Sequence, residues 1–115
     1  MIPALIAIGI GELILMDLWD TVVDWLRTFT REVTNIFNSI KKIEHATRVL
    51  AEKIENAGLF AVIHRIFYKE KGDYWQEDTI AQVAENKVPQ WAKAGVTSSE
   101  TDVTQKYQRE LSLTL

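Results

Sequence analysis

The sequence predicts a mainly α-helical chain, in which one long N-terminal amphipathic helix of coiled-coil type precedes a small α+β C-terminal part with a β-hairpin. Three observations predict this fold class. Neither glycine nor proline occurs between Glu12 and Ala57, the apolar residues of that segment repeat at a heptad spacing, and the pattern changes after Gly58. The chain of 115 residues therefore divides into residues 1–57 and residues 58–115.

The first element is an apolar N-terminal segment. Residues 2–19 contain only Glu12 and Asp17 as charged side chains, and their length is marginal against the roughly 20 apolar residues of a membrane span. No lysine or arginine precedes the segment, so we expect no secretory signal, and the location stays open between cytoplasm and membrane. The segment either enters a bilayer or continues the helix as an assembly core, and its predicted core residues are Leu5, Ile8, Gly11, Glu12 and Leu15.

The heptad pattern of the long helix is regular. With Trp19 at position a, every a and d position as far as Ala57 is apolar except Thr47. At the opposite positions b, c and f, only Val49 is apolar. This contrast predicts a helical seam that ends at Gly58. A break near Asn35–Ser39 into an antiparallel helical hairpin is the alternative.

The length of this helix predicts partners. A continuous helix over residues 13–57 would be about 67 Å long, whereas a compact chain of this size is about 35 Å across. The exposed stripe would be unfavourable by about 25 cal/mol per Å² of apolar surface, so we expect copies of the chain to cover it. Apolar e and g positions favour more than two chains. The predicted interface residues are Trp19, Val22, Leu26, Phe29, Val33, Ile36, Ile40, Ile43, Leu50 and Ile54.

The C-terminal part has a different pattern. Residues 59–68 are rich in β-branched and aromatic side chains, residues 69–73 have turn chemistry, and residues 74–83 again resemble a strand. We therefore predict a β-hairpin across residues 62–83, with a helical continuation over 59–68 as the alternative. Short helices are predicted at about 86–94, where Pro89 lies near the first turn and Gly95 follows the end, and at about 100–111 after Ser99.

The composition argues against several chemistries. The chain has no cysteine, which excludes disulfides, thiolate nucleophiles and iron–sulfur clusters. Its net charge of −3 argues against nucleic-acid binding. His45 falls on the polar helix face and His64 within an apolar run, so neither is predicted to bind a metal. No nucleophile, base and orienting group come together, and we predict no catalytic residue, no cofactor and no small-molecule substrate.

These observations favour a non-enzymatic, homo-oligomeric structural or assembly protein, whose long helix packs in a multi-subunit bundle, filament or pore. A soluble adaptor or immunity-type binding module is the first alternative, in which a different protein completes the apolar stripe. A small membrane-inserted effector is the second.

Overall fold

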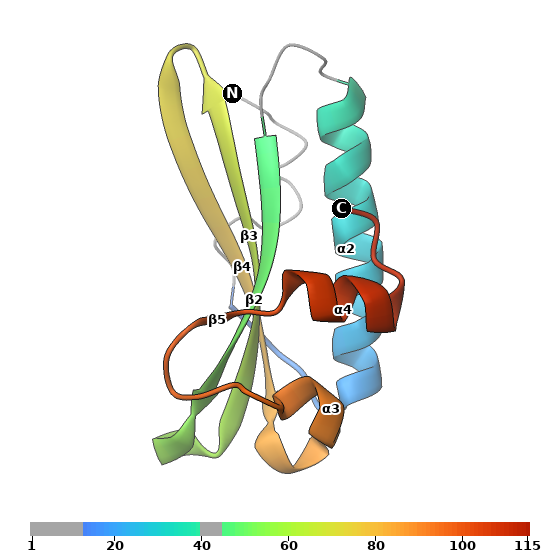
Figure 1. Ribbon diagram of the computed structural model, residues 1–115, viewed down its shortest axis with the longest axis vertical. Helices are drawn as coiled ribbons and strands as arrows, with labels where there is room; N and C mark the ends of the chain where they lie inside the picture. Colours follow the sequence, from blue (N-terminus) through green and yellow to red (C-terminus); the bar gives the residue numbers. More distant parts are fainter. Residues whose placement is uncertain (1–12, 40–44) are drawn as a thin grey trace.

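In the computed structural model, one long helix crosses one face of a mixed five-stranded β-sheet (Figure 1). The structure describes residues 13–39 and 45–115. The elements in chain order are β1 (Leu13–Leu15), α2 (Trp19–Ser39), β2 (His45–Ile54), β3 (Leu59–Glu70), β4 (Asp73–Ala84), α3 (Gln90–Lys93), β5 (Thr101–Asp102) and α4 (Thr104–Leu111). Short 3₁₀ helices follow β2 at Glu55–Ala57 and β4 at Glu85–Lys87.

The sheet is built around an antiparallel meander. Its strand order is β1–β4–β3–β2–β5, and only β1 runs parallel to its neighbour, β4. Val49 of β2 lies opposite His64 of β3, which lies opposite Thr79 of β4. Because side chains alternate along a strand, these three residues point to the same face. We call this face, on which α2 packs, the inner face.

Helix α2 forms because its apolar residues recur at helical spacing. Its hydrophobic stripe is buried against the sheet, while the opposite positions are exposed. Asp20 lies in the first turn, where a carboxylate interacts favourably with the helix dipole. The buried stripe residues are Trp19, Val22, Leu26, Phe29, Thr30, Val33 and Phe37.

Aromatic side chains join the helices to the sheet. The ring of Trp19 makes edge contacts with Phe60, Trp91 and Tyr107, at centroid distances of 6.5, 6.1 and 6.2 Å. The hydroxyl of Tyr107 donates a 2.8 Å hydrogen bond to the carbonyl of Ala92. Helices α3 and α4 are thereby held to the start of α2, on the inner side of the sheet (Figure 1).

The predicted mainly α fold is wrong, because the chain is an α+β domain. The helix of this region contains 21 residues, and residues 45–54 form strand β2. The apparent heptad continued through β2 because Leu50 and Ile54 have helical spacing. Val49 and Ala51, at alternating positions, are the β2 side chains that are fully buried.

The long rod predicted for residues 13–57 is therefore absent, and with it the coiled coil and the helical bundle. The chain measures 42 × 26 × 23 Å. Helix α2 does end at Ser39, within the range of the alternative break point, but the next described element, β2, is a strand and not a second helix. The sheet of the same chain covers the apolar stripe of α2, so the physical argument for association through this helix no longer holds.

The C-terminal elements differ in extent from their predicted bounds. The β3–β4 hairpin runs over residues 59–84, longer at both ends than the predicted 62–83. Helix α3 occupies only Gln90–Lys93 of the predicted 86–94, and α4 begins at Thr104, after the two-residue strand β5. Within residues 13–39 and 45–115, no helix is both long enough and apolar enough to cross a membrane.

Candidate association surface

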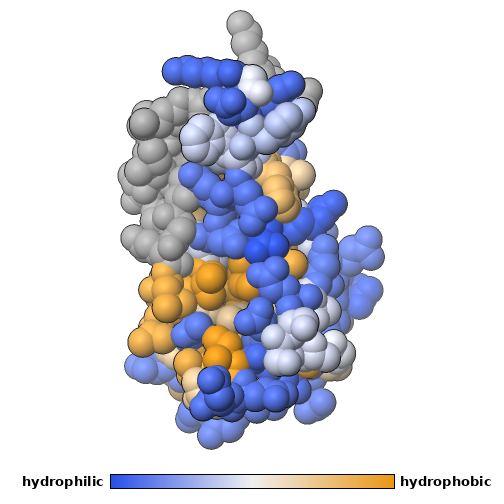
Figure 2. Space-filling view, turned by 90° about the vertical axis from the view of Figure 1, so that its left-hand side faces the viewer, coloured by the Kyte–Doolittle hydropathy of each residue, from blue (hydrophilic) through white to orange (hydrophobic). Residues whose placement is uncertain are grey.

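The two faces of the sheet have different surroundings. The inner face is covered by α2, α3 and α4, whereas none of the described helices lies over the opposite face, which we call the outer face (Figure 1). Figure 2 shows that apolar atoms gather in the lower half of that side of the molecule. The outer face therefore carries accessible apolar side chains that no described helix covers.

A row of aliphatic side chains crosses four strands of the outer face. Leu13 of β1 lies opposite Ile80 of β4, Ile80 opposite Ile63 of β3, and Ile63 opposite Leu50 of β2. Ile63 is only 3% exposed, and its neighbours in the row are more accessible. On these four strands the row has no polar residue, which is unusual for a sheet face that no described helix covers. On the fifth strand, Asp102 of β5 lies opposite Leu50 and ends the row.

The accessible aliphatic residues around this row form one surface, which we call the outer apolar patch. Two of them are strongly exposed, Leu13 at 59% and Leu15 at 74%. The remaining four are half-buried and could be covered further. The patch consists of Leu13, Leu15, Leu50, Ile54, Leu59 and Ile80.

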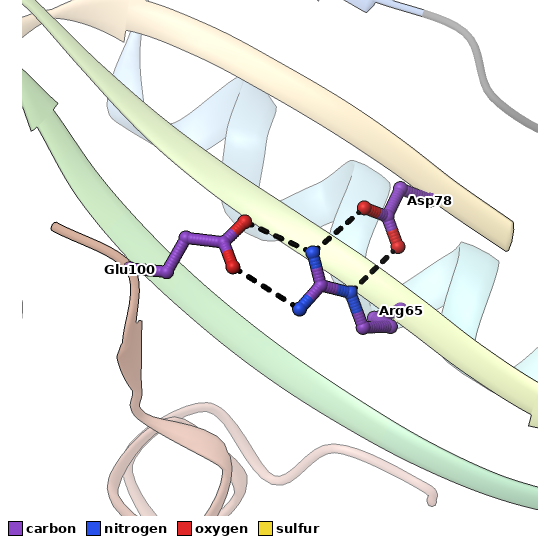
Figure 3. A network of polar contacts seen from close by, with 3 residues as sticks. All are labelled: Arg65, Asp78 and Glu100. Carbon is purple, nitrogen blue, oxygen red and sulfur yellow. Dashed lines mark hydrogen bonds and ion pairs between the residues drawn. The ribbon is translucent and has the colours of Figure 1, made fainter. Parts of the chain in front are cut away.

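A closed ionic network borders the patch (Figure 3). Arg65 of β3 donates from Nε and Nη2 to the two carboxylate oxygens of Asp78, at 2.8 and 2.9 Å. Its Nη1 and Nη2 donate to the carboxylate of Glu100, at 3.1 and 2.9 Å. These hydrogen bonds, first to Asp78 and then to Glu100, raise the pKa of Arg65 above its ordinary value. The guanidinium is thus largely saturated within the chain and holds the segment before β5 against the outer face.

Two opposite charges flank Leu50 on the outer face of β2. Arg48 is a little over half exposed and lies 3.8 Å from Asp102, a long distance for an ion pair. Glu52 is half-buried and makes no ion pair with any residue that the structure describes. Both charged groups are therefore available to a partner that covers Leu50.

The inner face also holds several buried or half-buried polar side chains. His64 is 1% exposed, its ring packs edge-on against Phe29 at 4.7 Å, and its Nε2 has no hydrogen-bond partner. Burial lowers the pKa of His64 to about 4. Burial raises the pKa of Glu77, and the hydroxyl of Tyr68, which donates to its carboxylate, partly opposes this shift. The imidazole is closed to a substrate, so we interpret His64 as part of the core.

Another polar feature is an open hollow between β5 and the start of α4. It encloses about 600 Å³ and is lined by Arg48, Lys106 and Arg109, together with Asp102. The Lys106 ammonium already donates to the carbonyl of Ala94 at 2.9 Å. The remaining polar side chains of its described lining are those of Thr101, Thr104 and Gln105, and the Thr104 hydroxyl is already engaged with the backbone of Val49. Among the described residues, no group of three or more His, Asp or Glu side chains could hold a metal ion.

The structure separates the residues predicted as interface or core. Those of α2 from Trp19 to Val33 are buried inside the chain, and Ile36 packs beside them. Leu15, Leu50 and Ile54 lie in the outer apolar patch. The predicted residues outside the described parts of the chain are Leu5, Ile8, Gly11, Glu12, Ile40 and Ile43.

Sequence reasoning missed Leu13, Leu59 and Ile80 as members of one surface. Their proximity depends on strand pairing between distant segments, for which the sequence contains no local signal. An alternating interpretation of residues 45–54 would have placed Arg48, Leu50 and Glu52 on one face.

No protein-family model, no curated protein and no solved structure matches this chain.

Proposed function

We propose that the protein is a non-enzymatic, self-associating assembly subunit and that it associates through the outer apolar patch. One observation carries this proposal: an aliphatic row crosses four of the five strands on a sheet face that no described helix covers, and its end residue Leu13 and the neighbouring Leu15 are 59% and 74% exposed. Contiguous exposed apolar surface of this kind marks interaction sites in soluble proteins.

The energetics favour coverage of the whole patch. Complete burial of a leucine or isoleucine side chain is favourable by about 1.5–3 kcal/mol. A symmetric dimer buries the patch of both copies, so every patch residue contributes once from each chain. Association itself costs about 4–15 kcal/mol in lost freedom of motion. One or two leucines are therefore insufficient, whereas the patch of two copies can exceed this cost.

The charge distribution favours a second copy as the partner. Among the described residues, the outer face carries three bases and four acids, so it is nearly neutral: Arg48, Arg65 and Lys69, and Glu52, Asp78, Glu100 and Asp102. A nearly neutral face with an apolar half offers little attraction to a strongly charged protein or surface. It does suit another face of the same composition.

The outer apolar patch also favours a different number of chains from the number expected for a coiled coil. The expectation of more than two chains depended on the e and g positions of a long helix. A single sheet face is satisfied when two copies pack face to face about a two-fold axis. We therefore propose a dimer as the basic unit.

Light scattering coupled to size-exclusion chromatography tests this proposal. We expect the wild-type chain to associate at micromolar concentrations and the double variant L13S/L15S to be monomeric. Leu18→Ser is the matched control, because Leu18 is also an exposed leucine (53%) but precedes α2 and lies outside the sheet. A monomeric wild type would overturn the proposal, and so would unchanged association of L13S/L15S. Association only with a different, co-expressed protein would favour the adaptor alternative.

A further inference from the structure

The charges beside Leu50 define how two copies would meet. This inference rests on the self-association proposed above and adds its geometry. We propose that the copies pack outer face to outer face with antiparallel β2 strands, about a two-fold axis along the row Leu13–Ile80–Ile63–Leu50. Arg48 of each copy then forms an ion pair with Glu52 of the other.

Strand geometry places the two charges symmetrically. Arg48 and Glu52 are two residues before and two residues after Leu50, so all three side chains project from the same face of β2. Each charged residue lies about 6.6 Å along the strand from the row, at about 3.3 Å per residue. A half-turn about the row exchanges these two positions, so Arg48 comes to lie opposite Glu52 of the second copy.

The charges discriminate between orientations. A two-fold axis between two facing sheets can run across the strands or along them. An axis along β2 would place Arg48 opposite Arg48 and Glu52 opposite Glu52, which is unfavourable. An axis across the strands makes both contacts attractive. Antiparallel β2 strands also agree with the strand directions of aligned sheet packing, which stay within about 30° of each other.

The residues of β3 and β4 on either side of the axis are also compatible with this two-fold arrangement. The rotation brings Asp78 opposite Gln82, whose amide can donate to a carboxylate. It brings Phe67, 39% exposed, opposite Leu59. Arg65, already saturated by its carboxylates, comes to lie opposite the small side chain of Ala61. No like-charge contact arises among these positions. The only position on the axis that meets its own charge is Asp102, which pairs with Leu50 at the edge of the described sheet; its side chain is 54% exposed, so solvent screens this contact.

The two ion pairs would act mainly on orientation. Arg48 is available because its contact with Asp102 is long and about half of each side chain is exposed. Partly exposed pairs at the edge of an apolar contact contribute little affinity but disfavour wrong registers. The outer apolar patch would supply the affinity, and the pairs would select the antiparallel arrangement.

A charge-reversal experiment tests this arrangement with full-length chains. Arg48→Glu and Glu52→Arg are measured separately and as an equimolar mixture by sedimentation velocity. Each variant alone replaces two attractive contacts with two repulsive ones, so we expect its self-association to weaken by about tenfold or more. In the mixture, a heterodimer again contains two opposite-charge contacts, and we expect association close to that of the wild type. Lys87→Glu and Glu32→Arg are the matched controls, with the same charge changes at exposed positions outside the outer face.

The outcomes separate the two proposals. Weak association of each variant, restored in the mixture, supports the two-fold arrangement. A wild type that associates while the variants behave like the controls, or while the mixture stays as weak as its components, overturns the arrangement but leaves self-association standing. A wild type that remains monomeric overturns both. Circular dichroism of each variant establishes that a loss of association is not a loss of folding.

Discussion

Arg65 and Asp78 face each other across β3 and β4 and share two hydrogen bonds of 2.8 and 2.9 Å, so that a bidentate ion pair lies on the outer face of the sheet. The side chains are 15% and 26% exposed, which leaves the pair only partly screened by solvent. Glu100 extends the pair to the segment before β5. The network thus links three segments that are distant in sequence.

This network predicts unequal effects of its two carboxylates. Asp78→Asn should lower the free energy of unfolding by about 1–2 kcal/mol, because it weakens two charge-assisted hydrogen bonds of the more buried carboxylate. Glu100→Gln should cost less than about 1 kcal/mol, because its side chain is 41% exposed. Urea denaturation measures both variants. Equal losses of stability in the two variants would show that the burial of each carboxylate does not determine how much it stabilises the fold.

Acid should destabilise the fold through His64. Its folded-state pKa of about 4 lies below the ordinary value of 6.5, so the folded state favours the neutral ring. The stability that depends on this neutral ring is present above pH 6.5 and decreases as the pH falls from 6.5 towards 4. The total loss is about 3 kcal/mol. The raised pKa of Glu77 acts in the opposite direction, because the folded state favours its protonated form.

His64→Leu isolates this effect. Urea denaturation of wild type and variant over the same pH range should give a steep loss of stability for the wild type and a shallower one for the variant. Parallel curves for the two proteins would mean that His64 is not the group responsible.

Thr104 should stabilise the fold through its hydrogen bonds to the backbone of β2. Its hydroxyl accepts a 2.8 Å hydrogen bond from the amide of Val49 and donates to the carbonyl of the same residue at 3.2 Å. Thr104→Val keeps the shape but leaves both buried backbone groups of Val49 without this partner, so we expect a loss of about 1–3 kcal/mol. Thermal unfolding measures the change, with Thr28→Val on the exposed face of α2 as the control. A variant as stable as that control would contradict this role.

The turn between β3 and β4 offers a stabilising substitution. Lys71 has φ of 53° and Gly72 has φ of 84°, as in a turn with two left-handed residues. Lys71→Asn should stabilise the protein by about 0.5–1 kcal/mol, part of the roughly 1–2 kcal/mol that a left-handed residue costs. Lys69→Asn removes the same charge from the neighbouring strand and should give no gain. Differential scanning calorimetry compares the two variants, and a lower melting temperature for Lys71→Asn would contradict the prediction.

Sequence reasoning succeeded where the signal was local. The apolar stripe from Trp19 to Phe37 specifies α2, and the aromatic and β-branched run after Gly58 specifies β3. It failed at β2, because this strand has few large apolar residues and Leu50 and Ile54 happen to continue the helical spacing. Strand β1 could not be predicted either, since Leu13 becomes a strand residue only by pairing with Ile80.

For the same reason, only part of the outer apolar patch could be predicted from the sequence. Leu15, Leu50 and Ile54 were selected for their places in a supposed helical seam, and they meet on the sheet through a different periodicity. The charge pattern around Leu50 has meaning only once the face of β2 is known.

Sedimentation equilibrium of the unmodified chain over a range of concentrations tests the central claim most directly. If the outer apolar patch joins two copies, the apparent mass should rise from 13.2 kDa towards twice that value as the concentration increases. A mass that stays at 13.2 kDa at every concentration would contradict it.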